Sequence, residues 1–320
     1  MCSRHFLPTI PREMARFELN ILGCGAATPT LRHLPTTQVV NVRDKLFMID
    51  CGEGAQIGFR RAHLKLNRLG HIFISHLHGD HCFGLPGLLS TMALTGHTGE
   101  LVIHAHPDAE QLFRPLFDYF CRENPFDIRF NAISPSSSEV IYSDRSVTIS
   151  TIPLKHRIPT CGFLFEEAQS DRHLRGDMVE FYNIPTYMRA AIKQGDDFIT
   201  PDGQTIPNAH LTLPATPPAR YAYCSDTMYN ERIIPLIEGA DLLYHEATFA
   251  DDNEAWASRT FHSTARQAAR IATKAGVKSL LLGHFSARYD KNEEILLQQA
   301  REEYANVQLA RENMQIVIKK

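Results

Sequence analysis

Residues 76–81, His-Leu-His-Gly-Asp-His, bring three imidazoles and one carboxylate into six consecutive positions. The apolar run 71–75 before them predicts a short buried strand. The segment 83–94 behind them opens with turn residues and continues in residues that favour a helix. The cluster therefore lies on a strand-to-helix loop, where successive side chains can point inward from different directions.

The side chains of this loop suit a metal ion that takes part in chemistry. Neutral imidazole and carboxylate are ligands for zinc, manganese or iron, and the lack of cysteine ligands favours a catalytic site over a closed structural one. On such a loop His76 and His78 can hold one ion while Asp80 and His81 hold a second. The alternative is a histidine-rich surface loop, since the chain has 16 histidines among 320 residues. The strand and helix on either side favour the metal site.

Strand and helix signals alternate along the chain, which indicates a layered α/β fold with the sheets in the middle. With 43% hydrophobic residues among 320, the chain can bury one large core or two modest ones. The expected strands are 17–23, 38–42, 46–50, 71–75, 101–105, 147–152, 161–165, 221–224, 242–245 and 279–283, and the expected helices are 108–121, 263–275 and 291–304. Between residues 167 and 219, charged residues, glycines and a proline-rich stretch interrupt this pattern, which indicates an insertion.

Composition argues against several classes of function. No apolar run approaches the roughly 20 residues of a membrane helix, and residues 1–8 lack the apolar stretch of a secretory signal, so we expect a cytoplasmic protein without a membrane partner. Seven scattered cysteines fit a reducing compartment. A net charge of -3 gives no general attraction to nucleic acid, so RNA binding must come from local clusters. The Gly-x-Gly at 23–25 lacks the third glycine of a dinucleotide site, because Thr28 occupies that position, and we expect no nucleotide cofactor.

Five further motifs accompany the histidine-rich loop. They are 50–56 (Asp-Cys-Gly-Glu-Gly-Ala-Gln), 84–89 (Gly-Leu-Pro-Gly-Leu-Leu), 245–249 (His-Glu-Ala-Thr-Phe), 262–264 (His-Ser-Thr) and 284–289 (His-Phe-Ser-Ala-Arg-Tyr). The loop, led by Ser75, resembles the signature of the metallo-β-lactamase superfamily of hydrolases. Together the motifs resemble ribonuclease Z, a family of endonucleases that trim the 3′ end of precursor tRNA. The resemblance runs from about Phe17 to the C-terminus.

This resemblance implies the fold and the metal ligands. The implied fold is a metallo-β-lactamase-like αββα sandwich, with two mixed sheets flanked by helices and the metals at one edge of the sheets. The implied ligands are His76, His78 and His156 for one ion and Asp80, His81 and His284 for the other, with Asp226 shared. We expect two zinc ions per subunit, with manganese or iron as alternatives.

The resemblance also implies the chemistry. A water activated by the two ions attacks the scissile phosphorus in line with the departing ribose 3′-oxygen, which leaves a 3′-hydroxyl on the tRNA and a 5′-phosphate on the trailer. Glu246 and His262 are expected to be catalytic, with the carboxylate orienting an imidazole that gives a proton to the leaving oxygen. Asp80 is expected to help position the nucleophile. Arg288 is expected to bind RNA phosphate, with a carboxylate ion pair as the alternative, and His245 to be structural.

The expected domain organisation is an N-terminal extension (1–16) and one catalytic domain (17–320) that carries an inserted flexible arm (167–219). In the family, the arm of one subunit of a homodimer holds the tRNA that the other subunit cuts. Precursor tRNA and a second copy of the chain are therefore the expected partners. The Gly-Pro element of the family's arm is missing here, because Pro185 is followed directly by Thr186.

Three functions stay open at this point. The motifs favour a zinc-dependent endoribonuclease that processes the 3′ end of precursor tRNA. The second is a phosphodiesterase of the same fold that acts on a small-molecule ester, because the fold does not fix the substrate. The third is a non-catalytic RNA-binding protein, which is disfavoured because all seven expected ligands are present.

Overall fold

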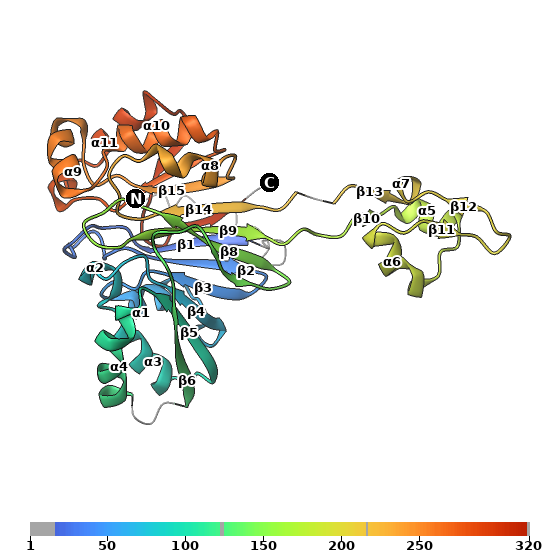
Figure 1. Cartoon of the computed structure of the whole chain (residues 1–320), viewed down its shortest axis with the longest axis horizontal. Helices are drawn as coiled ribbons and strands as arrows, with labels where there is room; N and C mark the ends of the chain where they lie inside the picture. The colour runs from blue at the N-terminus through green and yellow to red at the C-terminus, as the bar shows by residue number, and fades with distance from the viewer. Residues whose placement is uncertain (1–16, 122–124, 216, 319–320) are drawn as a thin grey trace, which may run out of the picture.

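Two seven-stranded sheets form the centre of the molecule in the computed structural model, which describes residues 17–121, 125–215 and 217–318 (Figure 1). The first sheet has the order β18 (Gln315–Val317), β1 (Phe17–Gly23), β2 (Thr37–Val42), β3 (Lys45–Ile49), β4 (Leu69–Phe73), β5 (Gly99–Ala105) and β6 (Phe126–Ala132). The second has the order β17 (Val307–Leu309), β16 (Leu280–Gly283), β15 (Leu242–Glu246), β14 (Arg220–Cys224), β9 (Cys161–Glu167), β8 (Val147–Pro153) and β7 (Val140–Ser143).

Each sheet contains a parallel half. Strands β3 to β6 pair in parallel, and so do β14 to β17. The carboxyl ends of parallel strands lie together at one sheet edge, where the following loops commonly form binding sites. The loops after β4, β14, β15 and β16 begin at such ends.

Helices cover the outer faces of both sheets, so the layers follow the order helix, sheet, sheet, helix (Figure 1). On the first sheet lie α1 (Ala55–Arg61), α3 (Leu85–Leu94) and α4 (Asp108–Phe120), and on the second α8 (Ile234–Ile237), α9 (Glu254–Thr260), α10 (Ala265–Ala275) and α11 (Glu294–Arg301). One hydrophobic core contains residues of both sheets with α10 and α11, and another lies between the first sheet and its helices. The expected αββα sandwich is confirmed.

Helix α10 shows how the sequence specifies one of these layers. A capping box fixes its first turn, because Thr264 accepts a hydrogen bond from the backbone N–H of Gln267 and the Gln267 side chain accepts one from Thr264. The helix ends at Gly276, whose φ of 59° lies in the left-handed region. On the outer face, Arg266 and Arg270 pair with acidic residues that follow α11. These ion pairs neutralise the basic face of the helix.

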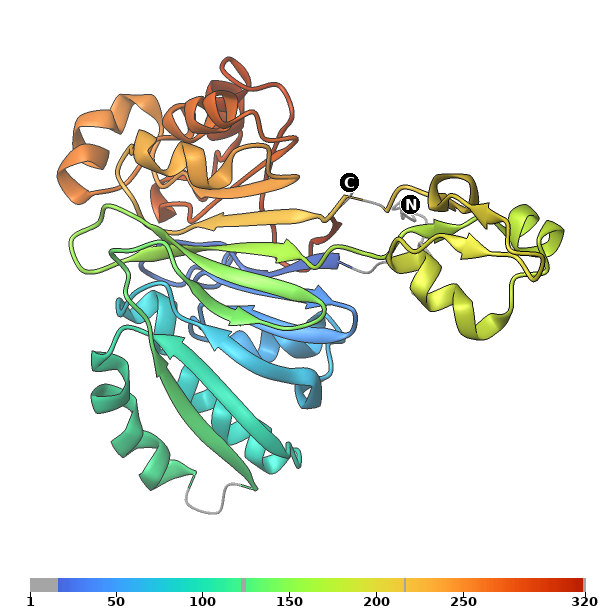
Figure 2. The same ribbon diagram turned by 45° about the vertical axis from the view of Figure 1, so that its right-hand side comes forward.

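A small lobe leaves the second sheet between β9 and β14 and projects away from the sandwich (Figures 1 and 2). Its elements are β10 (His173–Leu174), α5 (Gly176–Phe181), α6 (Arg189–Gln194), β11 (Phe198–Ile199), β12 (Thr205–Ile206), α7 (Asn208–Leu211) and β13 (Thr212–Leu213). The lobe has a core of its own, formed by Ile184, Ile192, Phe198, Ile206 and Leu211. It is therefore a separately packed module within the inserted segment.

The expected strands agree with observed ones to within two residues at each end. The difference at β4 is informative, because the strand ends at Phe73 and leaves Ser75 free to donate its backbone N–H to Asp50. The two-residue strands of the lobe were not expected, and neither were β6, β7, β17 and β18. The last two have three residues each and depend on neighbours far away in the sequence, such as Glu18 opposite Val317. The expected N-terminal extension, 1–16, lies outside the described residues.

Within the described ranges, no helix has the length and apolar character needed to cross a membrane.

Candidate metal centre

Seven side chains from four segments converge where strands of the two sheets end. His76 and His78 follow β4, and Asp80 and His81 lie on the short helix α2 (Gly79–Cys82). The other three follow strand ends: His156 comes after β8, Asp226 after β14 and His284 after β16. These are the seven ligands predicted from the sequence, and the structure brings them together in two adjoining groups.

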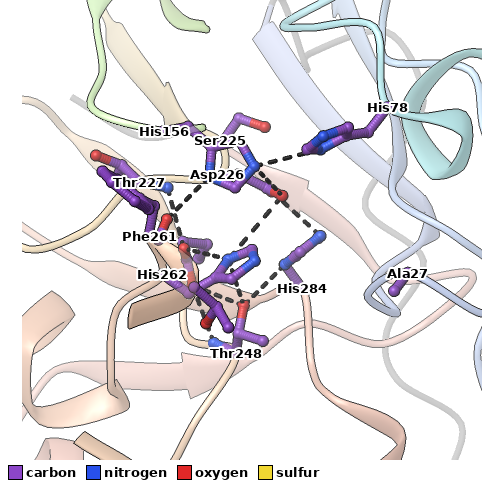
Figure 3. Close-up of polar contacts among 12 residues, drawn as sticks. Ala27, His78, His156, Ser225, Asp226, Thr227, Thr248, Phe261, His262 and His284 are labelled. Atoms are coloured by element: carbon purple, nitrogen blue, oxygen red, sulfur yellow. Dashed lines mark hydrogen bonds and ion pairs between the residues drawn. The ribbon is translucent and has the colours of Figure 1, made fainter. Parts of the chain in front are cut away.

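The first group contains His76, His78, His156 and Asp226, whose ligand atoms all lie within 4.8 Å of one another. His78 Nδ1 lies 3.0 Å from His76 Nε2 and 3.2 Å from His156 Nε2. Asp226 Oδ2 lies 3.6 Å from His76 Nε2 and 3.7 Å from His156 Nε2. Three imidazole nitrogens and one carboxylate oxygen thus face a common point. Figure 3 shows His78 and Asp226 of this group turned toward each other.

The second group contains Asp80, His81 and His284. The Nε2 atoms of the two histidines are 3.3 Å apart, and Asp80 Oδ2 lies 3.5 Å from His81 and 3.4 Å from His284. Asp226 reaches this group with its other oxygen, Oδ1, which lies 3.1 Å from His284 Nε2 and 3.4 Å from His81 Nε2. The two oxygens of Asp226 therefore face different groups. This is the arrangement of a carboxylate placed between two cations.

Hydrogen bonds behind the imidazoles determine which ring nitrogen faces the centre. His156 Nδ1 donates to the carbonyl of Phe261 at 2.9 Å, and His81 Nδ1 donates to Asp50 Oδ2 at 2.8 Å. Each of these bonds leaves the Nε2 lone pair of the ring directed at the cluster. His284 Nδ1 is held in the same way at 2.9 Å from the hydroxyl of Thr248.

Asp50 is a residue whose role the sequence interpretation missed. It is fully buried and accepts hydrogen bonds from the backbone and hydroxyl of Ser75 and from the hydroxyl of Tyr223, besides the bond from His81. It has a φ of 55°, which turns the chain sharply after β3. The available signal was an aspartate directly after a buried strand and two residues before Gly52.

Burial and charge set the protonation of the cluster. Burial lowers the pKa of His76, His78 and His156, so these rings are neutral, which is the form that binds metal. Burial raises the pKa of Asp226, but the imidazoles around it outweigh this effect and hold the pKa well below its usual range. At His81 burial lowers the pKa, and the nearby carboxylates raise it well above the ordinary value. A cation that binds there must therefore displace a proton.

Glu246 and His262 form a pair beside the two groups (Figure 3 shows His262). His262 Nδ1 donates to Glu246 Oε1 at 2.9 Å. The buried carboxylate also accepts bonds from the backbone of Thr227 and from the backbone and hydroxyl of Thr248. Burial lowers the pKa of His262, but Glu246 outweighs burial and the pKa rises to about 9. The imidazole therefore carries a proton at neutral pH that it can give up.

Two other residues from the sequence motifs lie further from the centre. His245 is next to Glu246 on β15, so its side chain points to the opposite face of the strand, and its Nδ1 donates to the Glu246 carbonyl at 2.7 Å. Arg288 is exposed and donates to Asn253 Oδ1 at 3.1 Å. Its expected contact with RNA phosphate stays a prediction.

A cleft of about 670 Å³ opens on the cluster, a volume within the range of small-ligand sites. Its lining includes Asp80, His156, Asp226, His262 and His284, and Phe83 is 65% exposed there. One wall is the loop after β1, where the backbone N–H of Ala27 donates to Asp80 Oδ2 at 2.8 Å. This loop therefore holds a predicted ligand in place.

Comparison with known proteins places this site in a family. The chain matches the family described as Anti-Pycsar protein Apyc1 over residues 17–213 and the beta-lactamase superfamily domain over residues 202–285. It is 59% identical over 277 residues to ribonuclease Z of Parabacteroides distasonis, which covers 87% of this chain and 91% of the relative. It is 57% identical over 305 residues to ribonuclease Z of Phocaeicola vulgatus, which covers 95% and 98%. The solved structure of the short form of human tRNase Z superposes with a TM-score of 0.68 at 25% identity, covering 95% of this chain and all of that one.

The layered fold and the histidine- and aspartate-rich cleft define a metal-dependent hydrolase of the metallo-β-lactamase fold. Within this class the chain belongs to the ribonuclease Z family, since both bacterial relatives exceed 50% identity over most of its length. The family expected from the motifs is confirmed, and so is the expected kind of enzyme, a metal-dependent endoribonuclease.

Proposed function

We propose that this chain removes the 3′ trailer from precursor tRNA with two zinc ions held by the seven converging residues. The observation that carries the proposal is the position of Asp226, whose two carboxylate oxygens face different ligand groups, in a chain of the ribonuclease Z family.

A cytoplasmic location is part of the proposal. It is supported by six described cysteines that are all free and buried, as suits a reducing compartment.

The residues present fit a pair of cations. Asp226 Oδ1 is buried and accepts no well-formed hydrogen bond within the described residues, although the Nε2 atoms of His284 and His81 lie 3.1 and 3.4 Å away. Such an oxygen is costly to bury, and a cation between it and the imidazoles would satisfy it. Oriented imidazole nitrogens surround it, and nitrogen with carboxylate oxygen suits zinc, while manganese or iron accept the same ligands. When bound, such ions polarise a phosphoryl oxygen and make water acidic enough to act near neutral pH.

The chain's own residues orient the reactants and move the proton. Asp80, held by the Ala27 N–H, lies where a carboxylate oxygen can accept a hydrogen bond from the attacking water. His262 gives the proton of its Nε2 to the departing ribose 3′-oxygen, and Glu246 keeps the ring in place through Nδ1. The products are a 3′-hydroxyl on the tRNA and a 5′-phosphate on the trailer.

The lobe between β9 and β14 is proposed as the arm that holds the tRNA. Its separate core and its projection from the sandwich suit a contact with a large substrate far from the cleft. It offers arginines for phosphate contacts, including Arg172, Arg175 and Arg189, and exposed aromatic rings at Phe181 and Tyr187. Deletion of residues 169–212 is expected to cripple tRNA cleavage while a small chromogenic diester is still hydrolysed.

A homodimer is proposed as the working form. The outer side of α4 supports it, because Leu112, Leu116, Tyr119 and Phe120 are between 39% and 65% exposed. An apolar surface of this kind is uncommon on a monomer and suits a second copy. Light scattering is expected to give the mass of two chains for the wild type and of one chain for a Leu112→Glu/Tyr119→Glu variant.

The direct test of the proposed function is incubation of the pure protein with a 3′-extended precursor tRNA, with and without chelator. We expect a single cut, a 3′-hydroxyl on the tRNA, a 5′-phosphate on the trailer, and no cut after chelation. The competing function is a phosphodiesterase for small esters. Rapid hydrolysis of a small diester together with intact precursor tRNA is the result that establishes it instead.

A further inference from the structure

The only tryptophan of the chain lies on α9, the helix that leads directly into Phe261 and His262. Trp256 is 41% exposed. A large aromatic ring left open to solvent is informative, because tryptophan is usually well buried. Nothing in the metal cluster or in the proposed proton transfer uses this ring.

Two arginines lie against the tryptophan. The guanidinium carbon of Arg259 is 5.4 Å from the Trp256 ring centroid, and that of Arg288 is 5.7 Å away. Neither arginine forms an ion pair within the described ranges of the chain, whereas Arg266 and Arg270 of the neighbouring helix α10 are held by carboxylates. Arg288 also donates to Asn253 Oδ1, but no carboxylate neutralises either guanidinium, so both charges and the exposed part of the ring remain available to a ligand.

The array formed by Trp256, Arg259 and Arg288 lies beside the catalytic cleft and contacts its lining through Arg288. Arg288 lies 5.4 Å from the centroid of Phe249 as well, and the Phe249 ring is 6.0 Å from the ring of His262. Phe249, Thr260 and His262 all line the cleft. A ligand whose reacting atom meets His262 can therefore extend past the edge of Phe249 and over the exposed Arg288 to the tryptophan.

We propose that Trp256, with Arg259 and Arg288, forms a stacking platform for the unpaired base immediately upstream of the scissile phosphate. The inference rests on the proposed cleavage of precursor tRNA. His262 protonates the departing 3′-oxygen, and that oxygen belongs to the upstream nucleotide. The base of this nucleotide is therefore on the same side of the cleft as His262 and the array.

The chemistry of the array suits a single-stranded nucleotide. Proteins recognise unpaired RNA bases by stacking them on aromatic rings or on guanidinium planes, while arginine also pairs with the adjoining phosphates. A local cationic site of this kind is needed here, because the net charge of the chain is -3. Stacking does not depend on base identity, so the platform positions the end of the tRNA without reading its sequence.

Intrinsic fluorescence tests the platform directly, since Trp256 is the sole tryptophan. The probe is an acceptor-stem hairpin RNA that ends in one unpaired 3′ nucleotide, added to the zinc-loaded enzyme. We expect the emission of Trp256 to be quenched, and a hairpin with an abasic ribose at this position to bind about tenfold more weakly. Unchanged emission at saturating hairpin, or equal affinity for the abasic form, overturns the proposal.

Kinetics with a 3′-extended precursor tRNA provide the second readout. Trp256→Ala is expected to raise KM about tenfold with little change in kcat, and Trp256→Phe to restore most of the loss, because it keeps an aromatic face. Arg129→Ala, which removes an exposed ion pair with Glu100 on the first sheet, is the control and should behave as the wild type. Wild-type KM in Trp256→Ala contradicts the platform.

Two further substrates decide which side of the cut the ring serves. An abasic site placed immediately upstream of the scissile phosphate should raise KM, whereas one at the first trailer nucleotide should not. The reverse pattern overturns the proposal. If the wild type leaves precursor tRNA uncut, the proposed function fails, and the fluorescence titration still decides whether the array binds an unpaired base.

Discussion

Two clusters of histidines, the metal cluster between the two sheets and a pair on the first sheet, differ in what surrounds the rings. In the metal cluster, Nδ1 of His81 donates to a carboxylate, and its Nε2 meets other ligands. In the second cluster, His71 on β4 and His104 on β5 lie 3.1 Å apart and contact each other. His104 stacks on Phe73 with centroids 4.4 Å apart, and His71 lies 4.3 Å from the ring of Tyr142.

The comparison shows what distinguishes a metal site from packed histidines. The His71–His104 pair has an amide behind it, because Asn131 Nδ2 lies 2.9 Å from His104 Nδ1, and no carboxylate within the described residues lies between the rings. The two rings satisfy each other and need no ion. The metal cluster instead directs several lone pairs at one point and places Asp226 among them.

The largest expected effect comes from removing a ligand. His78→Ala or Asp226→Ala should lower cleavage of a 3′-extended tRNA by about a thousandfold or more, because the bound ions contribute several kcal/mol to the transition state. Elemental analysis should show reduced zinc in both variants. His71→Phe, from the second cluster, is the matched control and should keep its zinc and its activity. Full activity in either ligand variant contradicts the assignment.

Removal of the proton donor is expected to have the next largest effect. His262→Ala should slow the chemical step by roughly 10² to 10⁴-fold, the usual contribution of a general acid, with zinc content unchanged. Single-turnover cleavage with saturating enzyme measures this step. Loss of zinc in the variant would show that His262 supports the metals instead.

A smaller effect, on zinc affinity, is expected for a residue that contacts a ligand but not the metal. Asp50→Asn removes the carboxylate that orients His81, and such outer partners change metal affinity by about 10 to 100-fold. Competition with a chromophoric chelator measures the zinc affinity. An unchanged affinity would mean that Asp50 serves to hold Ser75 and Tyr223 through their hydrogen bonds and does not tune the metal site.

The smallest effect concerns stability rather than activity. Burial lowers the pKa of His71 to about 4 and that of His104 to about 3, against an ordinary value of 6.5. Below about pH 6.5 the unfolded chain therefore binds more protons, and stability is lost progressively as the pH falls toward these values. His71→Phe should show a smaller fall in unfolding temperature between pH 7 and pH 5 than the wild type. An equal fall contradicts this origin.

Local patterns predict much of the sandwich. The segment 147–152 is rich in β-branched residues and 161–165 is almost entirely apolar, so both are recognisable as strands from sequence, and both bury most of their residues. The edge strand β18 was missed because three residues carry little signal and its order depends on pairing with β1. Helix α9 was missed in the same way, since its seven residues lack a long apolar period.

The residues of the metal site also divide into those that the sequence reveals and those that only the fold reveals. The loop 76–81 is conspicuous in sequence, but His156, Asp226 and His284 are single polar residues after strands, and only the family resemblance singled them out. Asp50 begins one of the family motifs, but neither its contact with His81 nor that of Ala27 with Asp80 could be predicted, because both contacts join residues that are distant along the chain. Backbone donors and supporting carboxylates become visible only when the fold is known.

Zinc titration of metal-free protein tests the central claim most directly, with cleavage of a 3′-extended precursor tRNA followed at each addition. A site shared through Asp226 predicts no cleavage without metal and full cleavage at two equivalents of zinc per chain. Full cleavage in the metal-free protein, or none at saturating zinc, would contradict it.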